Sequence, residues 1–238
     1  MTSKINGKLS AFFGLGMAAG VAYAVRLRPW LMNWGASWEE SRMALIGDDI
    51  APGCNYRSTR AISIDAPVEA VWKWLTQLGQ DRGGFYSYSW LENLFFADMR
   101  NADQIVPEFQ RERRIGDIVW LANPKRYGGR GRMIVAAIEP YRAMALVMPE
   151  DFERLQDGAL ARFGCWSFHL RSLHGGRTRL LVRSRSGNYS NLPQMMFDFM
   201  VFDPAHFVME RKMMLGIKER AERLTRQPPT QLSSPVGG

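Results

Sequence analysis

The alternation of apolar and polar residues divides most of the chain into short elements. Residues 57–65 alternate with the two-residue period of a strand, and the helical stretch VEAVWKWLTQLG follows directly after Pro67. Turns and loops that contain glycine or proline separate five further strand patterns, which indicates hairpins and an antiparallel sheet. These patterns cover residues 115–122, 132–139, 142–148, 162–172 and 177–186. A long helical pattern, which starts at Asp203-Pro204 and runs to about Leu224, closes the chain.

The last two predicted strands separate their side chains by face. Trp166, Phe168 and Leu170 share one side, as expected of a core face. Four arginines share the other side and are expected to face water: Arg177, Arg179, Arg183 and Arg185. The formal charge of +8 is therefore interpreted as a solvated sheet face. Because no base-reading motif accompanies it, nucleic acid is not a predicted partner.

The amino-terminal segment is the most apolar part of the chain. Residues 9–25, LSAFFGLGMAAGVAYAV, carry no charge and reach the short limit for a helix that crosses about 30 Å of hydrocarbon. We expect a single-pass membrane anchor and a membrane-anchored protein. One alternative is export after signal-peptide cleavage, because Ala22-Tyr23-Ala24 resembles a cleavage site, and another is a buried or peripheral helix. Arg26 and Arg28 favour the anchor, since positive charge directly after the segment resists translocation.

Composition predicts four parts. Residues 1–30 hold the predicted anchor, and residues 31–56, punctuated by glycine and proline, form a connecting arm. Residues 57–227 hold the strands and helices of one domain, and residues 228–238 are a predicted disordered tail. Cys54 and Cys165 have no partner nearby in the sequence and are interpreted as buried thiols, or as a bridge if the domain is exported.

The order of strand, short helix, antiparallel strands and long closing helix is that of an α+β helix-grip fold, a curved antiparallel sheet wrapped around a long C-terminal helix. The stretches TRAISIDAPVEAVWKWLTQLGQDRGGFYSYSWLENL and HFVMERKMMLGIKERAE resemble the SRPBCC superfamily, the START-like and polyketide cyclase/dehydrase-like group, over about residues 57–224. The resemblance implies a deep apolar cavity between the sheet and the last helix. It implies no single reaction, because the superfamily shares a cavity and no fixed catalytic set.

Candidate ligand contacts come from three segments. The last helix carries an apolar arc that also contains His206 and Glu210, four positions apart and within side-chain reach. The stretch DRGGFYSYSWLENL turns at Gly83-Gly84, and in a helix-grip domain its aromatic residues would cover the cavity mouth. With the apolar face of the strand at 162–172, these segments give the predicted ligand-binding residues: Tyr86, Tyr88, Trp90, Trp166, Phe168, His206, Phe207, Glu210, Met213, Met214 and Ile217.

We therefore expect the protein to bind a hydrophobic or amphipathic small molecule, such as a lipid, an isoprenoid or a polyketide-like compound. Two alternatives remain: a cyclase/dehydratase-type enzyme that uses Glu210 and His206, and a non-ligand interaction module at the membrane. Glu210 could equally pair with an arginine of the sheet and hold helix to sheet. The three histidines lack ligand spacing, and no HExxH motif or Cys/His cluster occurs, so neither a metal nor a cofactor is predicted.

Overall fold

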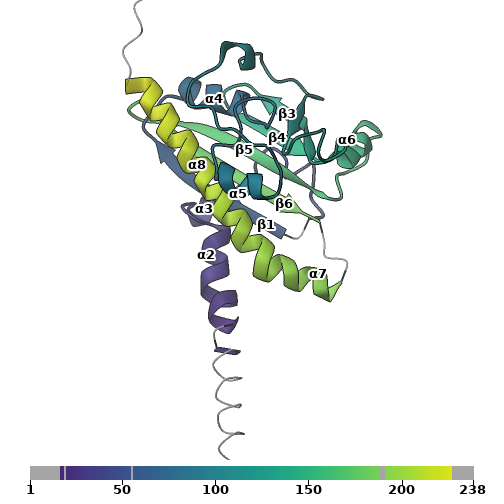
Figure 1. Ribbon diagram of the computed structural model, residues 1–238. Helices are drawn as coiled ribbons and strands as arrows, with labels where there is room; N and C mark the ends of the chain where they lie inside the picture. The colour runs from purple at the N-terminus through teal and green to yellow at the C-terminus, as the bar shows by residue number, and fades with distance from the viewer. Residues whose placement is uncertain (1–16, 19, 55, 188–190, 227–238) are drawn as a thin grey trace, which may run out of the picture.

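The computed structural model describes residues 17–18, 20–54, 56–187 and 191–226, and its architecture is α+β (Figure 1). A curved six-stranded antiparallel sheet, in the order β1-β6-β5-β4-β3-β2, lies against a long C-terminal helix that crosses its concave face. The helix-grip fold predicted from the sequence is therefore confirmed.

The strands are consecutive neighbours except for the first. They span Tyr56–Ile64 (β1), Ile118–Trp120 (β2), Arg132–Glu139 (β3), Ala143–Val147 (β4), Gly164–Leu173 (β5) and Arg177–Ser186 (β6). The tight turn between β5 and β6 pairs Leu173 with Arg177, while β1 joins β6 through a long-range register that sets Tyr56 opposite Ser186. The sheet therefore begins with a strand that pairs with the last one, which brings the two ends of the domain together.

Short helices flank the sheet and, in the amino-terminal segment, the C-terminal helix (Figure 1). They span Tyr23–Leu27 (η1), Arg28–Met32 (α2), Trp38–Arg42 (α3), Val68–Thr76 (α4), Ser89–Leu94 (α5), Pro107–Phe109 (η2) and Pro149–Gln156 (α6). Helix α6 falls where the sequence predicted a loop. Buried residues of α4, including Trp74 and Leu75, join Met214 and Ile217 of the last helix and Phe168 of β5 in one apolar core. This packing fixes the last helix across the sheet.

The C-terminal helix is longer than predicted. It runs without a break through α7 (Leu192–Phe197), a π-helical turn η3 (Asp198–Phe202) and α8 (Asp203–Arg226). Asp203 is therefore not a cap, and the predicted start is wrong. The π-helical turn rearranges the hydrogen-bond ladder just before Pro204, which has no N–H to donate, so the helix continues past it. The buried Asp203 carboxylate accepts a hydrogen bond from Arg28 Nε at 2.8 Å.

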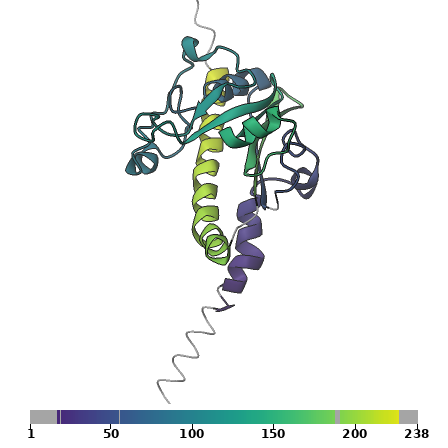
Figure 2. The same ribbon diagram turned by 90° about the vertical axis from the view of Figure 1, so that its right-hand side faces the viewer.

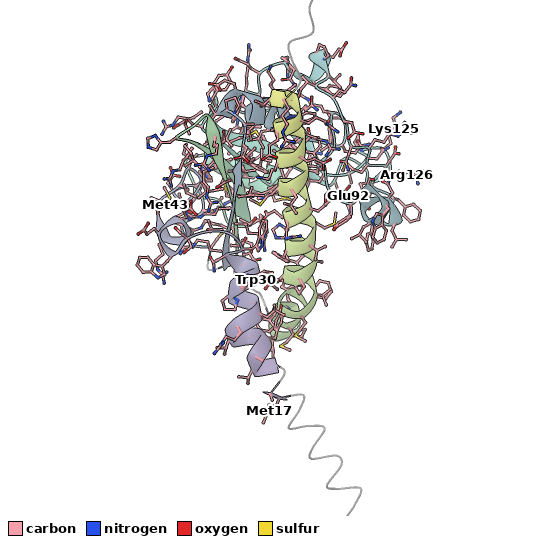
Figure 3. The ribbon with its side chains drawn as sticks, turned by 90° about the vertical axis from the view of Figure 1, so that its left-hand side faces the viewer. Met17, Trp30, Met43, Glu92, Lys125 and Arg126 are labelled. Atoms are coloured by element: carbon pink, nitrogen blue, oxygen red, sulfur yellow. The ribbon has the colours of Figure 1, made fainter. Side chains whose placement is uncertain are left out.

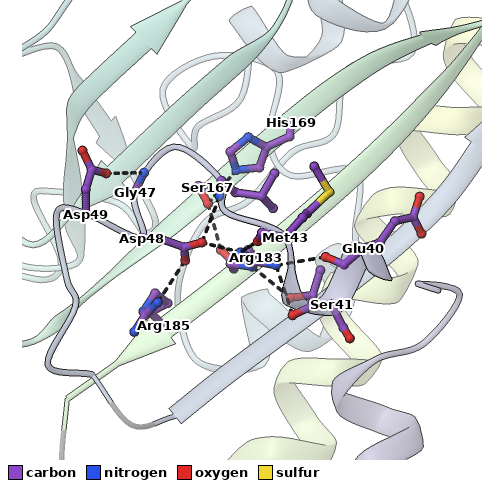
Figure 4. Close-up of polar contacts among 12 residues, drawn as sticks. Glu40, Ser41, Met43, Gly47, Asp48, Asp49, Ser167, His169, Arg183 and Arg185 are labelled. Carbon is purple, nitrogen blue, oxygen red and sulfur yellow. Dashed lines mark hydrogen bonds and ion pairs between the residues drawn. The ribbon is translucent and has the colours of Figure 1, made fainter. Parts of the chain in front are cut away.

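The outer face of the sheet is covered over Arg179, Arg183 and Arg185, contrary to the prediction that they face water, whereas Arg177 is exposed as predicted. The connecting arm crosses this face and supplies two acids (Figure 4). Arg179 donates to Glu40 at 2.7 and 2.9 Å, and Arg185 donates to Asp48 at 3.0 Å. Arg183, 1% exposed, also pairs with Asp48. Strand alternation predicted one apolar and one polar face correctly, but it could not show that acidic residues from a distant segment would cover the polar one.

The prediction of a single-pass membrane anchor is wrong. Part of the segment, residues 9–16 and 19, lies outside the described residues. Among the residues that the structure describes, no helix combines the length and apolar character needed to span a membrane. From Tyr23 onward, the chain packs beside the C-terminal helix instead (Figure 2). Tyr23 donates a hydrogen bond to the Phe199 carbonyl oxygen at 2.6 Å, and the Trp30 ring lies 5.4 Å from that of Phe207.

The two cysteines are buried, free thiols, so the bridge considered for an exported domain is absent. Both belong to a small apolar cluster beneath α6 and the arm, separate from the main core.

Candidate functional site

A cavity of about 430 Å³ lies between the sheet, α8 and the segment that leads into α5. Most of its wall is apolar and includes Phe85, Leu121, Met133, Trp166, Met209 and Met213. A smaller set of polar side chains also reaches it: Tyr56, Ser87, Glu92, Ser184, His206 and Glu210. A mostly apolar hollow with a few polar groups is the usual character of a small-molecule site.

Strand register and helix period explain why these side chains converge. Trp166 and Ser184 stand directly opposite each other on β5 and β6 and therefore share the inner face of the sheet. On α8, the positions of His206, Glu210 and Met213 recur every three to four residues, so one face of the helix points at the sheet. The cavity is the space that these two faces leave between them.

Glu210 is the centre of a buried polar network. Arg60, fully buried on β1, donates to Glu210 Oε2. Trp166 Nε1 donates to Oε1 at 2.8 Å, and Ser184 Oγ lies 3.4 Å from the same oxygen. Burial alone would raise the pKa of Glu210, but the Arg60 guanidinium and these hydrogen bonds hold it below its usual range. Glu210 is therefore an ionised and well-partnered carboxylate that ties helix to sheet.

His206 lies beside this pair as a neutral imidazole. Burial and the nearby Arg60 cation lower the pKa of His206. Its Nδ1 lies 3.3 Å from Arg60 Nη1 and accepts from that donor, which leaves the proton on Nε2, 3.6 Å from Glu210 Oε1. The Phe202 ring stacks on the imidazole with centroids 5.5 Å apart. His206 thus completes the polar network and adds no charge to the cavity.

Glu92 is the cavity carboxyl without a partner. It extends from α5, and its Oε2 atom is buried with no hydrogen bond to any described residue. Burial raises the pKa of Glu92 to about 7. The cavity therefore holds two carboxyl groups in different states, because Arg60 neutralises Glu210 and no cation in the described part of the chain neutralises Glu92. Glu92 lies in the stretch DRGGFYSYSWLENL, but no sequence pattern selects it, since a six-residue helix is too short to show a clear periodicity.

One end of the cavity depends on a buried carboxylate outside it. Asp151 of α6 is fully buried and accepts three backbone N–H groups, from Arg162 at 2.6 Å, Phe163 at 2.8 Å and Gly164 at 2.9 Å. Phe163 and Gly164 line the cavity, so Asp151 positions that part of the wall. Nothing in the sequence predicted this, because α6 itself was not predicted.

The structure places four of the predicted ligand-binding residues at the cavity: Trp166, His206, Glu210 and Met213. Phe168, Met214 and Ile217 lie in the solid core behind it. Phe207 faces away from it and packs against Trp30 of the amino-terminal segment.

The aromatic stretch is turned differently from the prediction. Tyr86 has a φ of 58° and is 1% exposed, and its hydroxyl donates to the Trp74 carbonyl oxygen at 3.0 Å. Trp90 is 68% exposed, and the centroid of its ring lies 6.4 Å from that of the Tyr88 ring. None of these three lines the cavity. Phe85, whose ring stacks 5.9 Å from that of Trp166, reaches it instead.

Comparison with known proteins adds little beyond the fold. No family model and no curated protein matches the chain. Similar solved structures include the Aha1 dimer from Colwellia psychrerythraea, at 14% identity over 70% of this chain and 96% of that one, with a TM-score of 0.39. A Polyketide_cyc-like protein from Corynebacterium glutamicum shares 15% identity over 71% of this chain and 89% of that one, with a TM-score of 0.32.

Proposed function

We propose that the protein binds an uncharged apolar or amphipathic small molecule in the cavity between the sheet and α8. The observation that carries this proposal is a hollow of about 430 Å³ walled mainly by aromatic and methionine side chains. At roughly 30 Å³ per water molecule it has room for about 14 waters, a volume that suits a bicyclic or short-chain compound. Apolar burial would supply most of the affinity, and methionines such as Met209 and Met213 can adapt to the shape of the ligand.

The alternative of an enzyme that uses Glu210 and His206 receives less support. A general acid or base needs a pKa near the working pH and a free path to the ligand. Glu210 is held as a carboxylate by Arg60 and Trp166, and His206 is neutral beside them. This network suits a role in holding helix to sheet and orienting a ligand. The alternative of a module without a cavity is disfavoured by the cavity itself.

The proposal is tested by narrowing the cavity. Replacing Met209, which lines it, with tryptophan adds a large side chain to the wall. Binding of 2-isopropylnaphthalene, followed by ligand-detected NMR, should weaken at least about tenfold in Met209→Trp, because the added ring occupies the space that the ligand needs.

The matched control is Val208→Trp, at the neighbouring helix position, where the side chain is 44% exposed. This variant should bind the probe as the wild type does. Equal affinities in wild type and Met209→Trp, or no binding to the wild-type chain at all, would contradict the proposed function.

A further inference from the structure

The side chain of Glu92 is placed to contact a ligand in the cavity. Helix α5 holds Glu92 at the side of α8, where its carboxyl group reaches the cavity (Figure 3). Its Oε2 atom is buried, and no described residue forms a hydrogen bond with it. Leaving a buried polar atom unpaired costs on the order of 1–3 kcal/mol. A ligand that supplies the missing partner would recover part of that free energy, so Glu92 is suited to be the polar contact that orients the ligand.

The basic groups on the surrounding elements are engaged elsewhere. The Arg126 guanidinium lies over the Phe96 ring, that of Arg132 lies over Trp120, and Lys212 Nζ lies over Tyr88. Lys125 is exposed on the loop between β2 and β3. Arg185, which also lines the cavity, donates to Asp48 Oδ1 at 3.0 Å, and no basic side chain among the described residues forms an ion pair with Glu92.

The other titratable groups nearby do not compensate for this. On α8, Glu210 is ionised and paired with Arg60, and His206 is neutral. On the loop after α5, Asp98 accepts a hydrogen bond from Asn123 Nδ2 at 2.9 Å. Burial raises the pKa of Glu92 to about 7, so the carboxyl group is mostly protonated below that pH. In this state it is a hydrogen-bond donor.

Within the ligand-binding function proposed above, we propose that the neutral Glu92 carboxyl group donates a hydrogen bond to an acceptor oxygen of the ligand. The ligand class is then an uncharged apolar compound with a carbonyl or comparable oxygen. A cationic amine would require an ionised Glu92, and burying both charges costs more than their attraction returns unless further hydrogen bonds satisfy them. The largely apolar wall offers few such bonds.

Three naphthalene derivatives of similar shape test this on the full chain: 2-acetylnaphthalene with a carbonyl, 2-isopropylnaphthalene without a polar atom, and 1-(2-naphthyl)ethylamine. At about pH 5.5 the wild-type protein should bind the ketone roughly three- to tenfold more tightly than the hydrocarbon, the ratio for one net hydrogen bond. This preference should disappear at about pH 8.5, where Glu92 is ionised and has no proton to donate.

Two variants separate the hydrogen bond from the charge. Glu92→Gln keeps an N–H donor at every pH, so its ketone preference should persist at both pH values. Glu92→Leu has no donor, so its ketone preference should be absent at both pH values while it still binds the hydrocarbon.

Equal binding of ketone and hydrocarbon by the wild type at about pH 5.5 would overturn the assignment of Glu92 and leave the proposed cavity function standing. An amine preferred over both, with affinity that rises as pH increases through about 7, would show an ionised Glu92 and overturn it as well. If none of the three probes binds the wild type, the proposed function and this inference both fail. The wild-type comparison alone decides the result if a variant does not fold.

Discussion

Replacing Glu210 with glutamine removes the charge at the centre of the buried network and leaves Arg60 without its carboxylate. Arg60 is fully buried and Glu210 is 2% exposed. Breaking such a pair by removing one partner costs about 3–5 kcal/mol, because the remaining charge stays buried and uncompensated. Arg60 would keep its hydrogen bond to the Leu31 carbonyl oxygen, 2.8 Å, and its position 5.4 Å from the centre of the Phe207 ring. We therefore expect the lower end, a loss of about 3 kcal/mol.

The assay is urea unfolding of the wild type, Glu210→Gln, Arg60→Met and the double variant Arg60→Met/Glu210→Gln at about pH 7.5. The double variant should cost at least about 2 kcal/mol less than the sum of the two single changes, since it leaves no unpaired charge. Glu219→Gln, an exposed change on the same helix, is the control and should stay within about 0.5 kcal/mol of the wild type.

The pH dependence has a defined sign. The pKa of Glu210 is lowered in the folded protein from its ordinary value of 4.5. Its contribution is therefore fully present above about pH 4.5 and is lost as pH falls through the lowered value. The gap between wild type and Glu210→Gln should shrink in acid. A loss below about 1 kcal/mol at about pH 7.5 would refute the structural role, and a loss of probe affinity with unchanged stability would assign Glu210 to ligand binding.

Three further changes test other parts of the structure. The pKa of Glu92 is raised, so its ionisation destabilises the fold as pH rises from 4.5 to about 7. In urea unfolding, Glu92→Gln should therefore be more stable than the wild type above about pH 7, by about 1–2 kcal/mol after solvent screening. Below about pH 4.5 the two proteins should be equally stable. In Asp151→Asn, the amide cannot accept three backbone N–H groups as the carboxylate does, so the free energy of unfolding measured in urea should fall by about 2–3 kcal/mol. The variant should also bind the probe more weakly, because Phe163 is displaced. An unchanged stability and an unchanged affinity would contradict the positioning role of Asp151. Gly216→Ala should lower the melting temperature although alanine favours helix, because the new methyl group would lie 2.8 Å from Tyr86 Cβ; a rise would show that the helix can move aside.

The fold was largely predictable because hydrophobic periodicity is a local property. Each strand pattern lies close to the observed strand, and the turn between Leu173 and Arg177 follows from its glycines. The arc of α8 that contains Glu210 and Met213 was visible from helix period alone. The start of that helix was less predictable, because Asp203-Pro204 has the composition of a helix start. Only the preceding π-helical turn shows that the helix continues through these two residues.

The outer face of the sheet shows the limit of this reasoning. Alternation correctly placed Arg179, Arg183 and Arg185 on one face. Their burial depends on Glu40 and Asp48, more than a hundred positions away, and no local pattern carries that information. The prediction of a membrane anchor failed for the same reason, since the contacts of Tyr23 and Trp30 with the C-terminal helix come from a segment distant in the sequence.

The sequence by itself determined the fold class, the inner face of the sheet and the helix face opposite it, because strand and helix periods fix which side chains share a face. Only the tertiary structure decided which carboxyl group has a partner. Arg60 on β1 pairs with Glu210 on α8, whereas Glu92 Oε2 on α5 has no hydrogen-bond partner among the residues that the structure describes. The ionisation of a buried carboxyl depends on charges and burial contributed by segments distant in the chain, so it exists only once those segments have come together.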